Sequence, residues 1–296
     1  MKDAAQPQEE SIFLPKSGLD SSNVREILFS KAQFMQRISS GKAFILDTLA
    51  CEPTAEVSTL TRDTRDFAIK LYHADPGIFS LLSCRGVVKI LDTGKQSIIS
   101  FVFILKIPEG LDDPRSLRNV LMAADHGLSL SARFKVAQQL ATSISYVHTY
   151  GFVHKCVSPE TVLVFQDKNS PLGSTYLVGF QKFRLAEGRT IRAGDDSWEK
   201  NIYRHPNRHG LSPEDDYVMQ HDIYNLSVCL LDIGLWQSFI TYEQDGRKLY
   251  RRLCYKPLVL LKTSERRMHS RSKMHSLTWH ESGYQAGWAT STLTSL

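Results

Sequence analysis

The longest apolar run in the chain is IISFVFIL, at positions 98–105. Its β-branched and aromatic side chains are typical of a buried β-strand, and the run is far shorter than the roughly 20 residues of a membrane-spanning helix. A buried strand needs neighbouring strands, and the chain supplies three candidates: KAFILDTLA (42–50), RDFAIKLYH (65–73) and GVVKILDTG (86–94). These patterns predict a small strand-rich region before residue 107.

The segment ahead of these strands carries a different pattern. In SSNVREILFSKAQFMQRISSG (21–41), apolar side chains recur at helical spacing between a serine that can cap a helix and Gly41, which can end it. We therefore expect an amphipathic helix at 21–41. Residues 1–20 are expected to be flexible, and their polar, acid-containing start does not resemble a signal peptide.

The pattern becomes helical after PEGLDDP (108–114), a turn-rich segment that predicts a hinge. Residues 129–151 place apolar side chains on one face of a helix, from Leu130 and Phe134 onward. Ser131 is the expected N-terminal cap of this helix, and Gly151 is its expected end.

Two short strands and a buried helix are expected next. TVLVF (161–165) and STYLVGF (174–180) predict strands that pair with each other. HDIYNLSVCLLDIGLW (221–236) is apolar nearly all round, which is typical of a helix in the core. Asp222 lies near the start of that helix, where a carboxylate favours the positive end of the helix dipole.

The segment HKCVSPET (154–161) resembles the catalytic loop of protein kinases. Kinases place a catalytic Asp and a magnesium-binding Asn in this loop. His154 matches the kinase histidine. Cys156 stands for the catalytic Asp, Ser158 for the usual Lys of the loop, and Thr161 for the magnesium-binding Asn.

Other segments extend the resemblance. LVGFQ (177–181) is similar to the kinase Asp-Phe-Gly motif, with Phe180 kept and Gly179 in place of the magnesium-binding Asp. Asp222 matches the Asp that braces the catalytic loop in kinases, and Lys70 in FAIKLY resembles the lysine that pairs with ATP. More narrowly, three segments resemble fungal kinase-like proteins of heterokaryon-incompatibility and prion-inhibition-type architectures: YVHTYGFVHK (146–155), SPETVLVF (158–165) and HDIYNLSVCLLDIGLW (221–236).

The resemblance implies an α+β, two-lobed protein-kinase-like fold with a small strand-rich N-lobe and a helical C-lobe. The expected parts are a flexible N-terminus at 1–20, an N-lobe at 21–107, a hinge at 108–114, a C-lobe at 115–260 and a low-structure tail at 261–296. Kinase C-lobes continue with several helices after the central one, and this chain lacks that pattern. We therefore expect the C-lobe to be incomplete, with an uncovered apolar face.

The resemblance also implies a loss of catalysis, because the base and both metal ligands are replaced. His154, Phe180 and Asp222 would remain as a structural brace. We predict a pseudokinase that binds or regulates a protein partner, without a metal or a cofactor. The alternative is an atypical active Ser/Thr protein kinase that binds ATP through Lys70 and recruits Asp195 or Asp196; Lys70 is otherwise a solvated strand lysine.

Composition limits the partners and the compartment. The net charge is +5, and residues 247–275 hold ten Lys or Arg and one Glu, so the rest of the chain is mildly acidic. This distribution argues against a nucleic-acid-binding protein. The basic segment is either a solvated surface or a contact for anionic surfaces. Five cysteines without a CxxC pair favour a reducing, cytoplasmic location.

Overall fold

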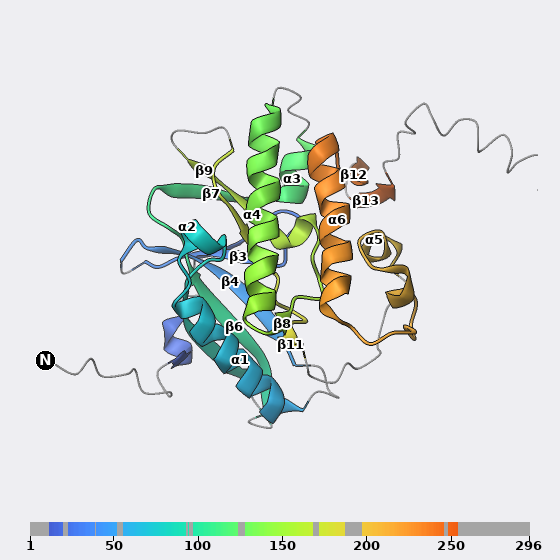
Figure 1. The fold of residues 1–296 in the computed structure, drawn as a ribbon. Helices are drawn as coiled ribbons and strands as arrows, with labels where there is room; N and C mark the ends of the chain where they lie inside the picture. Colours follow the sequence, from blue (N-terminus) through green and yellow to red (C-terminus); the bar gives the residue numbers. More distant parts are fainter. Residues whose placement is uncertain are drawn as a thin grey trace, which may run out of the picture. The chain divides into compact units, whose positions relative to one another are not determined.

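A six-stranded sheet forms the N-terminal part of the protein in this computed structural model (Figure 1). In spatial order its strands are β1 (Phe13–Leu14), β5 (Cys84–Leu91), β6 (Ile98–Lys106), β4 (Ala43–Ala50), β3 (Gln33–Gln36) and β2 (Val24–Glu26). The β1–β5 pair is parallel and the other pairs are antiparallel. The strands predicted from KAFILDTLA, GVVKILDTG and IISFVFIL are confirmed.

The structure describes residues 12–19, 23–38, 40–51, 56–92, 94, 97–123, 128–167, 172–186, 197–245 and 248–253. Of the described residues from 243 onward, it describes the backbone alone. All of these lie in one compact unit, Met1–Cys254, so the tail predicted at 261–296 lies outside them. None of the helices in these ranges is long and apolar enough to cross a membrane.

The remaining elements are mostly helical. The helices are α1 (Val57–Tyr72), α2 (Pro76–Phe79), α3 (Leu117–Met122), α4 (Leu130–Thr149), α5 (Trp198–Asn201) and α6 (Met219–Leu235), with short 3-10 turns at Lys16–Gly18, Pro159–Thr161 and Pro206–Arg208. The other strands are β7 (Leu111–Ser116), β8 (Phe152–Val153), β9 (Val162–Asp167), β10 (Thr175–Leu177), β11 (Arg184–Leu185), β12 (Ile240–Asp245) and β13 (Lys248–Leu253). The β12–β13 hairpin was not predicted from the sequence.

Both faces of the central strands are buried, which explains their continuous apolar runs. Successive side chains of β6 point to opposite faces of the sheet. Phe101, Phe103 and Leu105 join the main core, which includes Phe67 of α1. Val102 and Ile104 join a second, smaller cluster on the other face.

Helix α1 occupies the place of the strand predicted from RDFAIKLYH, so that prediction is wrong. Its buried residues are Asp63, Thr64, Phe67, Ala68 and Leu71, which is the spacing of one helix face. The alternation of polar and apolar residues in RDFAIKLYH covers only this short segment. The buried positions along the whole of α1 recur at helical spacing, and this pattern determines the structure. Lys70 lies on the exposed side of α1.

The amphipathic helix predicted at 21–41 is also wrong, because this segment forms β2 and β3. Leu28 and Ile38, which belonged to its expected apolar face, are 56% and 64% exposed. Met35 is instead buried and lies opposite Phe44 of β4. Pairing with a strand that follows in sequence therefore outweighs the local helical pattern.

The flexibility expected for residues 1–20 is wrong for β1, which adds a parallel strand beside β5. Gly86 makes the close approach possible, because a Cβ built on it would lie 2.7 Å from Leu14 Cγ. Ile12, just ahead of β1, is buried in the core. Residues 1–11 lie outside the described ranges.

The turn-rich segment predicted as a hinge continues into β7, which pairs with β9. On its other side β9 pairs with β10, so the strand pair predicted from TVLVF and STYLVGF is confirmed. The result is a second, three-stranded sheet in the order β10-β9-β7.

Helices α4 and α6 run side by side (Figure 1). The helix predicted at 129–151 is confirmed, although Ser129 rather than Ser131 caps it by accepting a hydrogen bond from Ala132 N. Gly151 follows its end with φ +83°. The helix predicted at 221–236 is confirmed as well, with Asp222 in its first turn.

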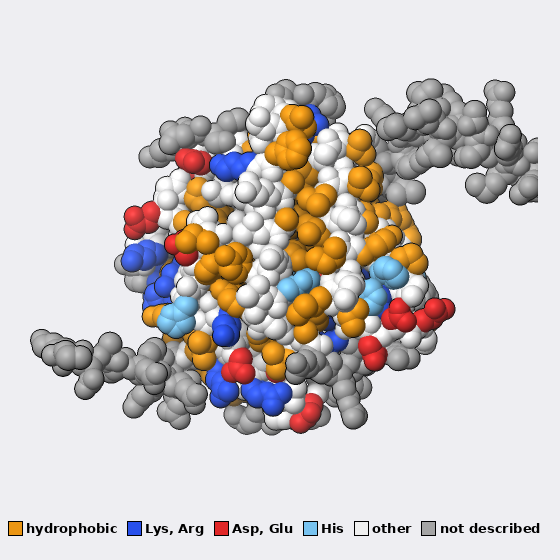
Figure 2. Space-filling view, viewed as in Figure 1, with side chains coloured by type: hydrophobic (Ala, Val, Ile, Leu, Met, Phe, Trp, Pro, Cys, Tyr) orange, Lys and Arg blue, Asp and Glu red, His pale blue; other side chains and the backbone are white. Residues whose placement is uncertain are grey.

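One side of this helix pair remains exposed, contrary to the burial expected for α6. Leu231 and Leu235 of α6 are 57% and 52% exposed, and Leu130 and Phe134 of α4 are 63% and 67% exposed. Apolar side chains consequently gather on the surface along both helices (Figure 2).

Candidate functional site

The loop at residues 154–161 is held from behind by Asp222 of α6. Its Oδ2 accepts hydrogen bonds from His154 N (2.8 Å) and lies 3.0 Å from His148 Nε2, while its Oδ1 accepts from Lys155 N (2.9 Å) and Tyr217 Oη (2.6 Å). Burial opposes ionisation of this fully buried carboxyl. The surrounding donors, led by His148, outweigh burial and hold the pKa of Asp222 below its usual range.

The His154 ring is part of the same buried support. Its Nε2 lies 2.9 Å from Val178 O, and its Nδ1 accepts a hydrogen bond from Cys156 N at 3.3 Å. This pattern assigns the proton to Nε2, and burial lowers the pKa of His154. The ring meets Phe180 edge-on, with centroids 5.2 Å apart. The structure thus brings His154, Phe180 and Asp222 together.

The hydroxyl of Thr161 is used within the loop. Its Oγ1 accepts a hydrogen bond from Ser158 N (3.1 Å) and lies within 2.9 Å of Ser158 O and 3.2 Å of Cys156 O. Thr161 also restricts Gly179, which has φ +83°: a Cβ built on Gly179 would lie 2.5 Å from Thr161 Cγ2. The backbone here therefore has no room for an Asp at position 179.

Asp47 is a site residue that the sequence did not single out. It lies on β4, is 1% exposed, and its Oδ2 accepts hydrogen bonds from Gly179 N (2.6 Å) and Phe180 N (2.9 Å). Burial raises its pKa against those two bonds. Its Oδ1 has no hydrogen-bond partner in the described part of the chain. A single acid inside the apolar run AFILDTLA was the signal that could have revealed it.

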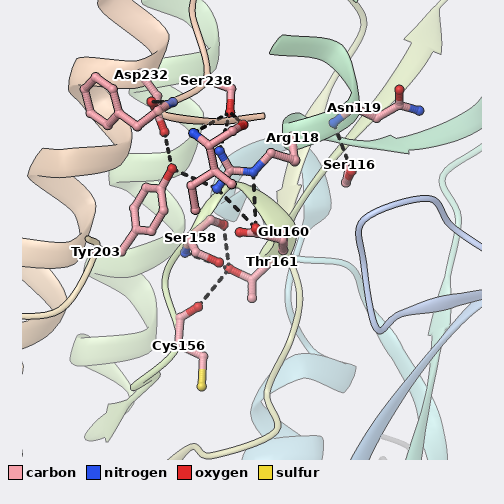
Figure 3. A network of polar contacts seen from close by, with 12 residues as sticks. Ser116, Arg118, Asn119, Cys156, Ser158, Glu160, Thr161, Tyr203, Asp232 and Ser238 are labelled. Atoms are coloured by element: carbon pink, nitrogen blue, oxygen red, sulfur yellow. Dashed lines mark hydrogen bonds and ion pairs between the residues drawn. The ribbon is translucent and has the colours of Figure 1, made fainter. Parts of the chain in front are cut away.

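A buried polar network fixes the other end of the loop (Figure 3). Arg118 of α3 is fully buried, and its guanidinium lies 3.1 Å from Glu160 Oε1 and donates to Tyr203 Oη at 2.8 Å and to Ser238 Oγ. Tyr203 Oη in turn donates to Asp232 Oδ2 at 2.7 Å. Burial raises the pKa of Asp232 to about 6, against the hydrogen bond from Tyr203 and the charge of Arg118.

A pocket with a volume of about 430 Å³ opens in front of the loop. It is bounded by the β2–β3 turn, the 154–161 loop, the segment after Val178 and the region of α5. Its lining residues are Leu28, Phe29, Ser30, Lys31, Lys155, Cys156, Val157, Ser158, Glu160, Thr161, Gly179, Gln181, Lys182, Glu199, Lys200, Tyr203, Arg204, Asn225 and Tyr242.

The pocket contains only some of the residues predicted from the sequence. Cys156, Ser158, Thr161 and Gly179 line it, whereas His154, Phe180 and Asp222 support the loop without lining the pocket. Lys70 is exposed on α1 and does not line the pocket, so the strand context that suggested its ATP role is absent. Asp195 and Asp196 lie outside the described residues. Of the basic segment 247–275, only 248–253 is described, as β13.

Cys156 lies among cations in the pocket wall. Lys182, Lys155 and Arg204 favour its thiolate, but burial dominates and raises the pKa of the Cys156 thiol. Burial and the nearby charge of Arg184 lower the pKa of Lys155 to about 8. The centre of the site is therefore a neutral thiol among positive charges.

The residues at this loop do not fit a magnesium ion, which prefers carboxylate oxygens. The Thr161 hydroxyl is bonded inside the loop, Gly179 has no room for a side chain, and Cys156 offers a protonated sulfur. No three His, Cys, Asp or Glu side chains in the described ranges form a group that could hold a metal. No step through a metal ion follows from this geometry.

Comparison with known proteins gives a distant relationship. No family model matches the chain. A probable serine/threonine-protein kinase of Dictyostelium discoideum is 23% identical over 252 residues, which cover 78% of this chain and 14% of that protein. The similarity suggests a kinase-like relationship, and the mixed α+β architecture with its strand-rich sheet is compatible with a kinase-like fold.

Proposed function

We propose that this chain is a pseudokinase, a catalytically degenerate protein-kinase-like domain that acts as a binding or regulatory scaffold. The similarity to the Dictyostelium protein and the order of elements support this proposal. In this interpretation, residues 21–107 form the small lobe, 108–114 the hinge and 115–260 the large lobe. His154, Phe180 and Asp222 serve as a brace between the loop and α6.

One observation carries the proposal: the Thr161 hydroxyl and the Asp47 carboxylate are bonded to the fold rather than presented to a substrate. The Thr161 hydroxyl is bonded within its own loop. One carboxylate oxygen of Asp47 accepts hydrogen bonds from the backbone N–H groups of Gly179 and Phe180. Cys156 replaces a base with a thiol that burial keeps protonated. A general base alone contributes about 10²–10⁴ in rate, so these replacements remove useful phosphoryl transfer.

The direct test is transfer of radiolabelled γ-phosphate from ATP, with Mg²⁺ or Mn²⁺, to the chain itself and to generic peptide substrates. We expect no transfer above that of heat-denatured protein. Metal-dependent transfer that is lost in Cys156→Ala would overturn the proposal and establish the alternative, an active Ser/Thr kinase. Lys70→Ala is the matched comparison, because it is exposed and lies outside the pocket.

Nucleotide binding is tested separately by thermal unfolding with and without Mg-ATP. A ligand at 100 times its Kd stabilises the folded state by about 2.7 kcal/mol, which a melting curve resolves. We expect the melting temperature to stay unchanged. A clear rise would show that ATP binds, even in a domain that does not transfer phosphate.

We further propose a protein partner and a cytoplasmic setting, as in signalling or self/non-self responses of fungal type. A domain without its own chemistry acts through contacts, and the described cysteines, Cys51, Cys84, Cys156 and Cys229, are all free thiols. Fractionation of cells that express a tagged chain tests the compartment. Recovery only in a secreted fraction would contradict this setting.

A further inference from the structure

The pocket in front of the loop carries an excess of positive charge. Five Lys or Arg residues line it, against two carboxylates, Glu160 and Glu199. Glu160 lies 3.1 Å from the guanidinium of the buried Arg118, which is itself outside the lining, so its charge is already matched. Several positive charges in one low-dielectric pocket raise the affinity of the pocket for an anion.

Three of these cations lie in the lining near Cys156. Lys155, Lys182 and Arg204 lie close enough to Cys156 for each of their charges to favour its thiolate. Burial nevertheless keeps the thiol neutral, so Cys156 itself supplies no negative charge there. Lys155 and Lys182 form no ion pair with any described carboxylate.

Another part of the wall is apolar and includes aromatic rings. Phe29, at the tip of the β2–β3 turn, packs on Tyr242 with ring centroids 4.4 Å apart. Tyr203 contributes a buried ring whose hydroxyl is already bonded to Arg118 and Asp232. Leu28 and Val157 complete this side of the lining. Such a surface suits a flat apolar group, and the volume of about 430 Å³ is in the range of small-molecule sites.

We propose that this pocket binds a small organic anion, an acidic group on a flat apolar body, directly and without a divalent metal. The acidic group lies beside Cys156, among Lys155, Lys182 and Arg204, and the apolar body lies against Phe29 and its neighbours. The inference rests on the proposed function, since it assigns a ligand class to the pocket of a domain that does not catalyse phosphoryl transfer. It differs from nucleotide binding in needing neither a metal nor a phosphate chain.

The test is isothermal titration of the whole chain with phenyl phosphate in buffer containing EDTA. We expect saturable binding, weaker binding of inorganic phosphate, and none of phenol, because both the charge and the ring contribute. Affinity should fall as salt is raised, since the cations are partly exposed. Binding that requires added Mg²⁺, or no saturable binding up to several millimolar, would overturn the inference.

Variants locate the site. Lys182→Glu should weaken phenyl phosphate binding at least tenfold, because it places a negative charge where the anion lies. Lys135→Glu is the matched control, on an exposed position of α4 outside the pocket, and should leave affinity unchanged. Phe29→Asn, which tolerates the positive φ of 60° at this position, should reduce the advantage of phenyl phosphate over inorganic phosphate. Equal losses in the two lysine variants would contradict the placement.

The two proposals fail in different ways. If phenyl phosphate does not bind and no phosphate transfer is seen, the ligand inference fails and the pseudokinase proposal stands. If the chain transfers phosphate from ATP, the pseudokinase proposal fails whatever the result with phenyl phosphate.

Discussion

The loop at 154–161 has a rear side and a front side that differ in how their charges are satisfied. At the rear, Asp222 accepts several hydrogen bonds and His154 is bonded through both ring nitrogens. At the front, the charges of Lys155 and Lys182 lie near a thiol that burial keeps neutral. The comparison separates two tasks: the rear holds the shape of the loop, and the front determines what it can bind. Substitutions at the front can therefore change chemistry without unfolding the loop.

The largest effect on stability is expected from Asp222→Ala, which removes a hydrogen-bond acceptor on the rear side of the loop. It leaves the buried N–H group of His154 and the half-buried N–H group of Lys155 without an acceptor, so we expect a loss of about 3–5 kcal/mol in the free energy of unfolding. Urea unfolding measures it. Asp66→Ala, on α1 and paired among the described residues with the neighbouring Arg65, should change stability by less than about 0.5 kcal/mol. Similar values for the two variants would refute the bracing role of Asp222.

A smaller loss of stability is expected from Gly179→Ala, at a position between the rear and the front of the loop. The new Cβ would meet Thr161 Cγ2 at 2.5 Å on a backbone with φ +83°, and we expect a cost of about 2–3 kcal/mol. Gly41→Ala is the matched control: φ is +65° but nothing lies within 4 Å, so only the backbone strain of about 1 kcal/mol remains. Thr161→Ser removes the clashing methyl group and should recover part of the loss. If it recovers nothing, the clash is not the cause.

The pH dependence of stability tests the buried network around Arg118. Asp232 has a folded-state pKa of about 6, above its ordinary value of 3.8, so the folded state binds a proton more tightly than the unfolded state. Protonated Asp232 therefore contributes to the free energy of unfolding at low pH, and this contribution is lost as pH rises from about 4 to about 6. Asp232→Asn removes this trend, which amounts to about 3 kcal/mol for a pKa raised from 3.8 to about 6. Unfolding curves of both proteins between pH 4 and pH 7 should diverge in that window; parallel curves would contradict the shift.

The smallest effect is expected from Lys70→Ala. Lys70 is exposed on α1 and lies in neither the rear support nor the pocket. Both stability and phenyl phosphate binding should stay within experimental error, with a stability change below about 0.5 kcal/mol. A tenfold loss of ligand binding would show that the pocket extends to α1, and the distinction between front and rear would need revision.

The sequence predicted the parts of the fold that depend on local burial. IISFVFIL and KAFILDTLA are strands because both of their faces are buried, and a continuous apolar run records that directly. The errors arose where a long-range contact outweighs a local pattern. Residues 21–41 lie in the sheet because Met35 pairs across to β4, and RDFAIKLYH is helical because its buried residues follow a longer period.

The candidate site was predictable only where a motif carried it. The resemblance singled out Cys156, Thr161 and Gly179, which do line the pocket. It did not single out Asp47 or Arg118, because their partners lie far along the chain: Asp47 bonds to Gly179, and Arg118 reaches Tyr203. The pocket itself depends on the β2–β3 turn, where the sequence favoured a helix.

Phe67 links the order of folding to the site. Its ring lies 6.2 Å from that of Phe103 in the sheet and 4.9, 4.7 and 4.8 Å from those of Phe152, Phe180 and Phe183 on either side of the loop. Phe67 and Phe183 are more than a hundred positions apart, so we expect the closing of this cluster to slow folding, as contacts of high sequence separation do. Once formed, it makes the sheet and the loop a single cooperative unit, and heating should abolish both in one transition.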